Sequence, residues 1–326
     1  MIENQSVYVA ENNGISQRKK RIRFGTDNIE LALLGLPVVV WFTLFSYLPM
    51  FGIIIAFKRY RPVGSNFFDS LLKSDWIGFE NFSFLFRTPD AFIILRNTVL
   101  YNLVFIFSGV IVSVTLAVMI SQLHSTLLAK FCQTLMFLPH FLSWVVVGYF
   151  VFAFLSVDKG LVNQILKGLG RDSIQWYTQA KYWPGLLVTV NIWKGMGYSM
   201  VVYLASIMGI DASLYEAASI DGATKWQQVK NITLPLLTPI ITIMLILAVG
   251  RIFSSDFGLF YNVPRRSGPL YDVTQTIDVY VYNALTQSNN IGFAAAASVT
   301  QSIVGLFTIV GANALVRKLN SESSLF

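Results

Sequence analysis

The stretch LALLGLPVVVWFTLFSYLPMFGIIIAF, residues 31–57, carries no charged side chain over its whole length. An apolar run of about 20 residues is long enough to cross the hydrocarbon core of a bilayer as a helix. A cleaved signal peptide has a shorter apolar core followed by a small-residue cleavage site, which this run lacks. The sequence therefore predicts a retained membrane-spanning helix here.

Further apolar runs of similar length follow along the chain. They lie at residues 92–120, 132–156, 184–208, 234–253 and 293–316. Hydrophobic residues make up 54% of the 326 positions and charged residues 13%, whereas a typical soluble domain carries about 25% charged residues. We therefore expect an all-α integral membrane protein with six transmembrane helices, surrounded by membrane lipid.

Basic residues near the two ends suggest the orientation. An even number of spans puts both termini on one side, and basic residues favour the cytoplasmic side. The basic residues concerned are Arg18, Lys19, Lys20, Arg21, Arg23, Arg317 and Lys318. The rule is not obeyed throughout, because Lys58, Arg59, Arg61, Lys159, Lys167, Arg171, Arg265 and Arg266 would then lie outside. We expect an inner-membrane protein with a cytoplasmic arm (1–30), a membrane domain (31–320) and a cytoplasmic tail (321–326).

Several chemistries are excluded by composition. The single cysteine, Cys132, rules out an internal disulfide and a cysteine-built metal site, and only two histidines are present. The net charge of +7 is spread between the apolar runs rather than gathered on one domain, so no nucleic-acid partner is expected. Neither a metal site nor a set of catalytic residues is predicted.

The polar segment between the fourth and fifth runs reads DASLYEAASIDGATKWQQVKNITLP, residues 211–235. It predicts two short helices. Asp211 or Ser213 can cap the first helix, and Ser213 with Glu216 fits a capping box. Gly222 permits the left-handed turn that ends this helix.

The second short helix is expected to start at Asp221 or Thr224 and to be terminated by Pro235 as the chain re-enters the bilayer. The alanine side chains add little bulk to the surface of this helix pair, and a few larger apolar side chains are available for contacts. Such a helix pair can fit a groove on another protein, or it can be an ordinary structured loop.

The same segment resembles the EAA motif of permeases in binding-protein-dependent ATP-binding-cassette importers. The matching residues are Glu216-Ala217-Ala218, Asp221-Gly222-Ala223, Ile232-Thr-Leu-Pro235 and Pro239. Val229 departs from the pattern, because an aromatic residue often stands there. The resemblance implies a coupling loop at about 211–234 that docks on a separate ATPase through Glu216, Ala217, Ala218, Asp221, Gly222, Ala223, Trp226, Leu234 and Pro235.

Further stretches resemble the carbohydrate branch of these permeases, which serves oligosaccharides and polysaccharides and includes a permease of an alginate importer. They are Tyr47–Phe57, Ser255–Tyr261, Ile277–Tyr282 and the alanine-rich final run. The resemblance implies a type I importer permease fold and alternating access. It also implies a second homologous permease, a cytoplasmic ATPase dimer, a periplasmic or extracellular solute-binding protein and a carbohydrate substrate.

ATP and Mg²⁺ are expected on the partner ATPase. The chain has no Gly-Lys dipeptide and so lacks the loop and lysine that cradle nucleotide phosphates. No cofactor is expected on this chain itself.

Polar residues in and after the spans suggest a translocation path. Asn191, Trp193, Lys194 and Tyr198 lie in the fourth run, and Arg251 and Asp256 flank the end of the fifth. Ionisable groups in a membrane usually face a cavity or a partner, and sugars are held by aromatic faces and hydrogen bonds. The alternative is structural: Lys194 caps carbonyls, and Arg251 reaches the interface with Asp256 as its neighbour.

Proline and glycine interrupt several runs, at Pro37, Pro49, Pro139, Gly195, Gly197 and Pro239. They predict either cavity-lining breaks or kinks that serve packing. Small residues from Gly292 to Ser298, with Gly305 and Gly311, predict close helix contacts in the last run.

Other functions remain open at this point. The importer could carry a non-sugar solute. A secondary transporter would normally show duplicated halves or a chain of intramembrane carboxylates, and neither is visible. A membrane-embedded glycosyltransferase would need paired carboxylates, whereas Asp69, Asp75 and Glu80 around Lys73 have the spacing of a solvated loop.

Overall fold

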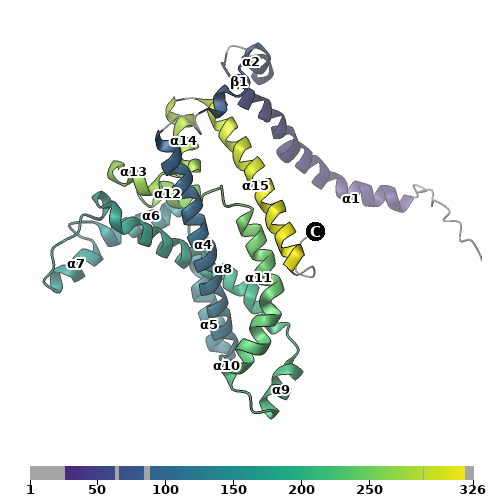
Figure 1. Ribbon diagram of the computed structural model, residues 1–326, viewed down its shortest axis with the longest axis vertical. Helices are drawn as coiled ribbons and strands as arrows, with labels where there is room; N and C mark the ends of the chain where they lie inside the picture. The colour runs from purple at the N-terminus through teal and green to yellow at the C-terminus, as the bar shows by residue number, and fades with distance from the viewer. Residues whose placement is uncertain (1–25, 63–65, 84–88, 289, 320–326) are drawn as a thin grey trace, which may run out of the picture. The chain divides into compact units, whose positions relative to one another are not determined.

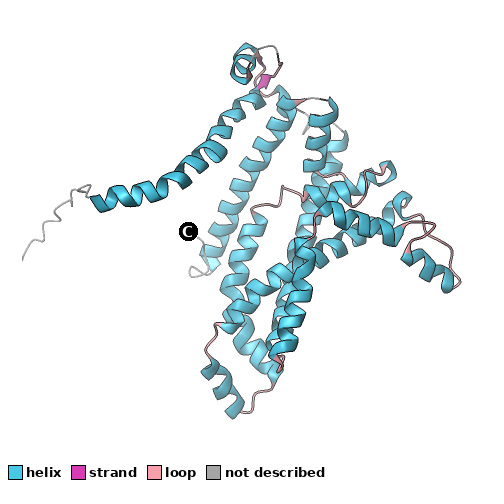
Figure 2. Cartoon of the chain, turned by 180° about the vertical axis from the view of Figure 1, so that it is seen from behind, coloured by secondary structure: helices cyan, strands magenta, loops and turns pink. Residues whose placement is uncertain are grey.

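The computed structural model describes residues 26–62, 66–83, 89–288 and 290–319, so most of the predicted arm and the whole predicted tail lie outside the described residues. The described chain is almost entirely helical (Figures 1 and 2). It divides into two compact units, Met1–Phe51 and Gly52–Phe326.

The first unit contains most of the predicted first span, residues 31–51. Helix α1 (Thr26–Phe42) continues into a π-helix (Thr43–Tyr47) and a 3-10 helix (Leu48–Phe57) whose end belongs to the second unit. Pro49 cannot donate a backbone hydrogen bond and its ring crowds the preceding turn, so the α-helical pattern changes here without breaking the span. The helical run Glu30–Phe57 is long and apolar enough to cross a membrane, as predicted.

Long helices make up most of the second unit. They are α4 (Pro89–Ser121), α8 (Trp183–Met208), α11 (Leu234–Val249) and α15 (Ile291–Leu319). Within the described residues, the helical runs that pass the length and hydropathy requirement for a span are Glu30–Phe57, Asp90–Ser121, Lys225–Val249 and Ile291–Lys318. Two bent helix pairs, Thr126–Phe141 with Trp144–Leu155 and Ala180–Met208 with Ala212–Ile220, raise the number from four to six when each pair counts as one span. This range includes the predicted six.

The third predicted span is bent rather than straight. It consists of α5 (Thr126–Phe137), a 3-10 turn (Leu138–Phe141) and α6 (Trp144–Leu155). The axis turns by 100° at the break, which contains Pro139. The Ser143 side chain then caps α6 by accepting a hydrogen bond from the Val146 backbone N–H. The helices of this span begin at Thr126, earlier than the predicted start at 132, and the bend lies at Pro139, where the sequence predicts a break or kink.

The core of the second unit follows α4 and α8, which lie side by side in both views (Figures 1 and 2). One buried cluster is centred on Trp183 and Leu187 of α8 and includes Leu259 and Phe260. A second cluster joins α4 and α8 to Leu237 of α11. These buried apolar faces fix the three helices relative to one another.

Short elements make up the connections of the second unit. They are β1 (Lys58–Arg59), α2 (Phe67–Lys73), β2 (Asp75–Trp76), a 3-10 turn (Glu80–Phe82), α7 (Leu161–Gly168), 3-10 turns at Trp176–Thr178, Ala180–Tyr182 and Gly268–Leu270, α12 (Phe257–Asn262), α13 (Tyr271–Thr274) and α14 (Ile277–Ser288). Strands β1 and β2 pair antiparallel, with Lys58 opposite Trp76. This two-residue ladder is a small departure from the predicted all-α class.

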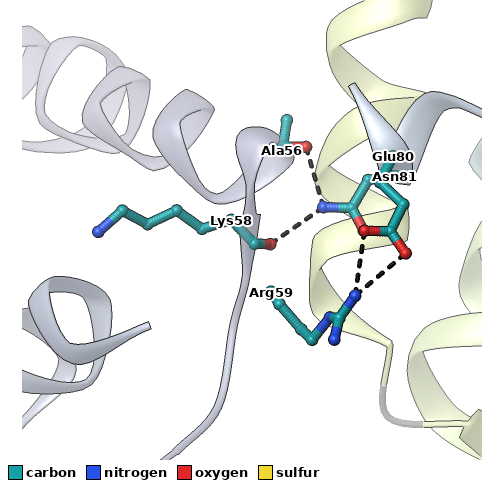
Figure 3. A network of polar contacts seen from close by, with 5 residues as sticks. All are labelled: Ala56, Lys58, Arg59, Glu80 and Asn81. Atoms are coloured by element: carbon teal, nitrogen blue, oxygen red, sulfur yellow. Dashed lines mark hydrogen bonds and ion pairs between the residues drawn. The ribbon is translucent and has the colours of Figure 1, made fainter. Parts of the chain in front are cut away.

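Asn81 holds the first of these connections in place (Figure 3). Its side-chain amide donates to the backbone oxygens of Ala56 at 2.9 Å and Lys58 at 3.0 Å. Beside it, Arg59 forms an exposed ion pair with Glu80 at 3.0 Å. A Cβ atom at Gly292 would lie 2.7 Å from the Asn81 amide nitrogen, so the start of α15 packs tightly against this network.

Candidate functional site

The first helix of the predicted coupling loop is α9 (Ala212–Ile220). Its N-cap is Asp211, whose Oδ1 accepts a hydrogen bond from the Ser213 backbone N–H at 2.9 Å. This hydrogen bond lowers the pKa of Asp211, because it favours the ionised carboxylate. The expected capping box of Ser213 with Glu216 is not formed, because Asp211, two residues before Ser213, takes the capping position.

Gly222 ends α9 as expected. Its φ of +80° lies in the left-handed region that glycine adopts without strain. The backbone N–H of Ala223 bonds to Ala218 O at 2.9 Å, and that of Gly222 bonds to Ser219 O at 3.1 Å. These two bonds form a Schellman cap, which satisfies the last carbonyls of the helix.

The second helix, α10 (Lys225–Gln228), starts at Thr224, one of the two predicted positions. The Thr224 hydroxyl accepts from the Gln227 backbone N–H at 3.3 Å, and the Thr224 N–H donates to Gln227 Oε1 at 2.7 Å. This is a complete capping box, which sequence inspection missed.

Pro235 does not terminate this second helix, contrary to the prediction. Helix α10 continues through a π-helix (Val229–Thr233) into α11, and Lys225–Val249 is one helical run. Proline is tolerated in the first turn of a helix, and the π-turn before it lets the Leu234 N–H reach Val229 O. The predicted fifth span of 234–253 therefore extends further towards the N-terminus and ends earlier.

The predicted docking residues lie together around α9 and α10, at one end of the second unit (Figure 1). Glu216, Ala217, Asp221, Gly222, Trp226 and Pro235 are exposed, and Ala218, Ala223 and Leu234 are half-buried. Ile220 is 86% exposed and Trp226 is 70% exposed. Large apolar side chains on a small, well-capped helix pair are suited to contact a partner protein.

Side-chain hydrogen bonds join α9 to the helix that follows it. Gln228 Nε2 donates to Ser219 Oγ at 2.8 Å, and the hydroxyls of Tyr215 and Thr233 lie 2.9 Å apart. Sequence inspection missed both pairs, because their members are separated by 9 and 18 positions and belong to residue types that are common in loops.

The predicted path residues are only partly brought together. Lys194 Nζ donates to His140 O at 2.8 Å and lies 3.4 Å from Pro139 O, which also accepts from the Leu142 backbone N–H at 3.2 Å, so the ammonium supplies a donor to carbonyls at the bend in the third span. The structural alternative is therefore confirmed for the contacts of Lys194. The same ammonium lies 5.2 Å from the Trp144 ring centroid.

Asp256 bonds to Trp144, not to Arg251. Trp144 Nε1 donates to Asp256 Oδ2 at 2.9 Å, and Asp256 also caps α12 through Leu259 N. Burial raises the pKa of Asp256 above its usual value. The Arg251 side chain is exposed and forms no ion pair within the described residues.

The remaining path residues lie on α8. Tyr198 stacks on His140 with ring centroids 4.9 Å apart, Trp193 is 37% exposed and Asn191 is half-buried. The aromatic partners Trp144 and His140 were not predicted; Pro139, which marks the bend next to them, was the available signal.

Comparison with known proteins gives a consistent result. The family model "Binding-protein-dependent transport system inner membrane component" matches residues 109–321. The chain is 35% identical to the polygalacturonan/rhamnogalacturonan transport system permease protein YteP of Bacillus subtilis (strain 168), over 94% of this chain and 95% of YteP. It is 29% identical to the arabinooligosaccharides transport system permease protein AraP of Halalkalibacterium halodurans, over 86% of this chain and 85% of AraP.

Solved structures match as well. A chain from the crystal structure of a bacterial ABC transporter involved in the import of the acidic polysaccharide alginate aligns with a TM-score of 0.81 and 32% identity, over 90% of this chain and 97% of that chain. A chain from a bacterial alginate ABC transporter in complex with an alginate pentasaccharide-bound periplasmic protein aligns with a TM-score of 0.80, 32% identity and coverages of 90% and 96%. The predicted type I permease fold is confirmed, and the chain belongs to the family of inner membrane components of binding-protein-dependent transport systems.

Proposed function

We propose that this chain is one of two permease subunits of an ATP-driven importer that carries an oligosaccharide or polysaccharide across the cytoplasmic membrane. The observation that carries the substrate class is the near full-length similarity to YteP, AraP and a chain of the alginate transporter, each named for a saccharide. Both termini of this chain would then be cytoplasmic, and a solute-binding protein would deliver the saccharide on the opposite face.

The coupling role rests on α9. Its cap at Asp211 and its glycine end at Gly222 hold a short helix in a defined position, with exposed apolar and acidic side chains. A separate ATPase dimer would bind ATP and Mg²⁺, and its closure would displace α9. The displacement would then switch the paired permeases between inward-open and outward-open arrangements.

The polar cluster around Trp144 is consistent with either a neutral or an acidic saccharide. Lys194 supplies a positive charge near the Trp144 ring, whereas Asp256 supplies a carboxylate at the Nε1 edge of the same indole.

The test is reconstitution of the assembled transporter. The chain is co-expressed with a second permease, an ATPase and a solute-binding protein, and the complex is purified through a tag on this chain. We expect all three membrane-associated subunits to co-purify and ATPase activity to rise when the binding protein is loaded with uronate oligomers or neutral oligosaccharides. A complex stimulated by amino acids or peptides but by no saccharide would contradict the substrate class. Substrate uptake by this chain alone without ATP would contradict the importer.

A further inference from the structure

We propose that Gln228 and Thr233 are positioning residues that make α9 move together with α11 rather than with α8. The proposal rests on the proposed function of α9 as the segment that docks on an ATPase. It specifies which of the two spans flanking α9 receives the displacement.

The first observation is the hydrogen bond from Gln228 to Ser219. Gln228 is only 3% exposed, and its Nε2 lies 2.8 Å from Ser219 Oγ. The Ser219 hydroxyl in turn donates to the backbone oxygen of Tyr215 at 2.7 Å, so its own hydrogen is used within α9 and its oxygen is left to accept from Gln228. A hydrogen bond to a buried amide is shielded from competition by water.

The second observation is the hydroxyl pair of Tyr215 and Thr233. The oxygens lie 2.9 Å apart, and Thr233 is completely buried at the end of the π-helix. Tyr215 and Ser219 are four positions apart and so lie on one face of α9. Two hydrogen bonds from one face, to two points on the next helix, resist both sliding and rotation of α9 against that helix.

The third observation is the continuity of the helix that holds these bonds. Gln228 ends α10 and Thr233 ends the π-helix, yet Lys225–Val249 is one helical run. A displacement of α9 is therefore transmitted through one continuous helix into the membrane-spanning part of α11.

The connection to α8 differs. Only Gly209, Ile210 and Asp211 separate α8 from α9, and the chain turns by 69° there. A cavity of about 390 Å³ separates α9 from α8: it is lined by Leu204, Ile207 and Met208 of α8 and by Ala212 and Tyr215 of α9, and it reaches Lys225 and Gln228 of α10. Because side chains do not fill this volume, α9 can tilt relative to α8 with little steric resistance.

The test uses near-isosteric substitutions in the fully assembled transporter, reconstituted in proteoliposomes. Tyr215→Phe and Thr233→Val each delete a hydroxyl, and Gln228→Leu deletes the amide. Thr238→Val is the matched control, because its hydroxyl bonds only to Leu234 O within α11. The readout is saccharide imported per ATP hydrolysed.

We expect each of the three variants to lower this ratio about fivefold, the factor that corresponds to about one net hydrogen bond, while ATP hydrolysis continues and Thr238→Val matches wild type. Tyr215→Phe with Thr233→Val should be no worse than either alone, because both remove the same bond. Ratios equal to that of Thr238→Val in all three variants would overturn the proposal.

A second measurement does not depend on transport. Spin labels are placed at Ser213 with Leu247 and at Ser213 with Val201, in a Cys132→Ser background. Trapping the ATPase with ADP and vanadate should leave the distance from α9 to α11 unchanged and alter the distance from α9 to α8; the reverse result would overturn the proposal.

If Gly222→Pro uncouples transport while the hydroxyl variants do not, only this inference fails. If Gly222→Pro is also silent, the proposed function of α9 fails.

Discussion

A Cβ atom at Gly197 would lie 2.0 Å from the backbone oxygen of Met136, so α8 meets the end of α5 backbone to backbone. This contact lies next to the bend at Pro139 and brings Lys194 within reach of the carbonyls there. Glycine is required at this position by the space, because any side chain must move one of the two backbones.

Gly197→Ala is therefore expected to destabilise the purified complex by about 1–3 kcal/mol, as overpacking of a tight contact does. Gly195→Ala is the matched control, since a Cβ atom there meets nothing within 4 Å. Thermal unfolding of both variants checks this. Equal midpoints for the two alanine variants would contradict the close approach of the helices.

The hydrogen bonds of Asp256 give a second prediction. Asp256→Ala removes the partners of Trp144 Nε1 and Leu259 N and should cost about 1–3 kcal/mol. Asp256→Asn keeps one acceptor oxygen, for either Trp144 Nε1 or Leu259 N, and is a good helix cap, so it should cost less stability than Asp256→Ala at neutral pH. Thermal unfolding again provides the comparison.

The pH dependence of the same pair follows from the raised pKa of Asp256. Because the folded pKa lies above the unfolded value of about 3.9, ionisation costs stability as the pH rises past that value, and the cost is absent below it. The stability of Asp256→Asn relative to wild type should therefore fall as the sample is acidified towards pH 4. A relative stability that rises on acidification would show that the carboxylate is favoured by folding.

The exposed ring of Trp193 gives a prediction about the path. Trp193→Ala should lower saccharide uptake about three- to tenfold, the range expected for one aromatic contact, while assembly and ATP hydrolysis stay normal. Lys194→Ala should instead lower the yield of assembled complex, because His140 O at the bend loses the side-chain donor that Lys194 gives it. Uptake unchanged by Trp193→Ala, at equal expression, would assign that side chain to the scaffold.

The close packing of Gly292 against the network of Figure 3 should contribute more to stability than the surface ion pair between Arg59 and Glu80. Gly292→Ala brings a Cβ atom to 3.0 Å from Lys58 O and 2.7 Å from the Asn81 amide and should cost about 1–3 kcal/mol. Arg59→Ala removes a half-exposed pair with Glu80 and should cost less than about 1 kcal/mol. Gly311→Ala, which meets nothing within 4 Å, is the control on the same helix. Proteolytic cleavage between residues 58 and 91 measures the effect, and greater sensitivity in Arg59→Ala than in Gly292→Ala would contradict it.

The features that were predictable from sequence are the local ones. The apolar runs are long enough to decide the spans by themselves, and the positive φ of Gly222 and the caps at Asp211 and Thr224 depend on residues within a few positions. The bend at Pro139 was visible as a proline, but its angle depends on the helix that packs against it.

The features that were not predictable involve ordinary residues brought together from distant positions. Trp144 and Asp256 are 112 positions apart, and the residues around each of them give no indication that the two side chains are hydrogen-bonded. The π-helix before Pro235 and the bonds from Gln228 and Thr233 to α9 depend on the exact rotation of one helix against another. No spacing rule for a single helix encodes that rotation.

The ratio of saccharide imported to ATP hydrolysed, measured in proteoliposomes for wild type and for two α9 variants, tests the central claim most directly. Gly222→Pro cannot adopt the φ of +80° found there, and Ala217→Trp places a bulky side chain on the exposed face of α9, with Ala217→Ser as the matched small control. The account predicts that both disruptive variants assemble and hydrolyse ATP but import several-fold less saccharide per ATP, while Ala217→Ser behaves as wild type. Normal uptake with normal substrate-stimulated ATP hydrolysis in Gly222→Pro and Ala217→Trp would contradict it.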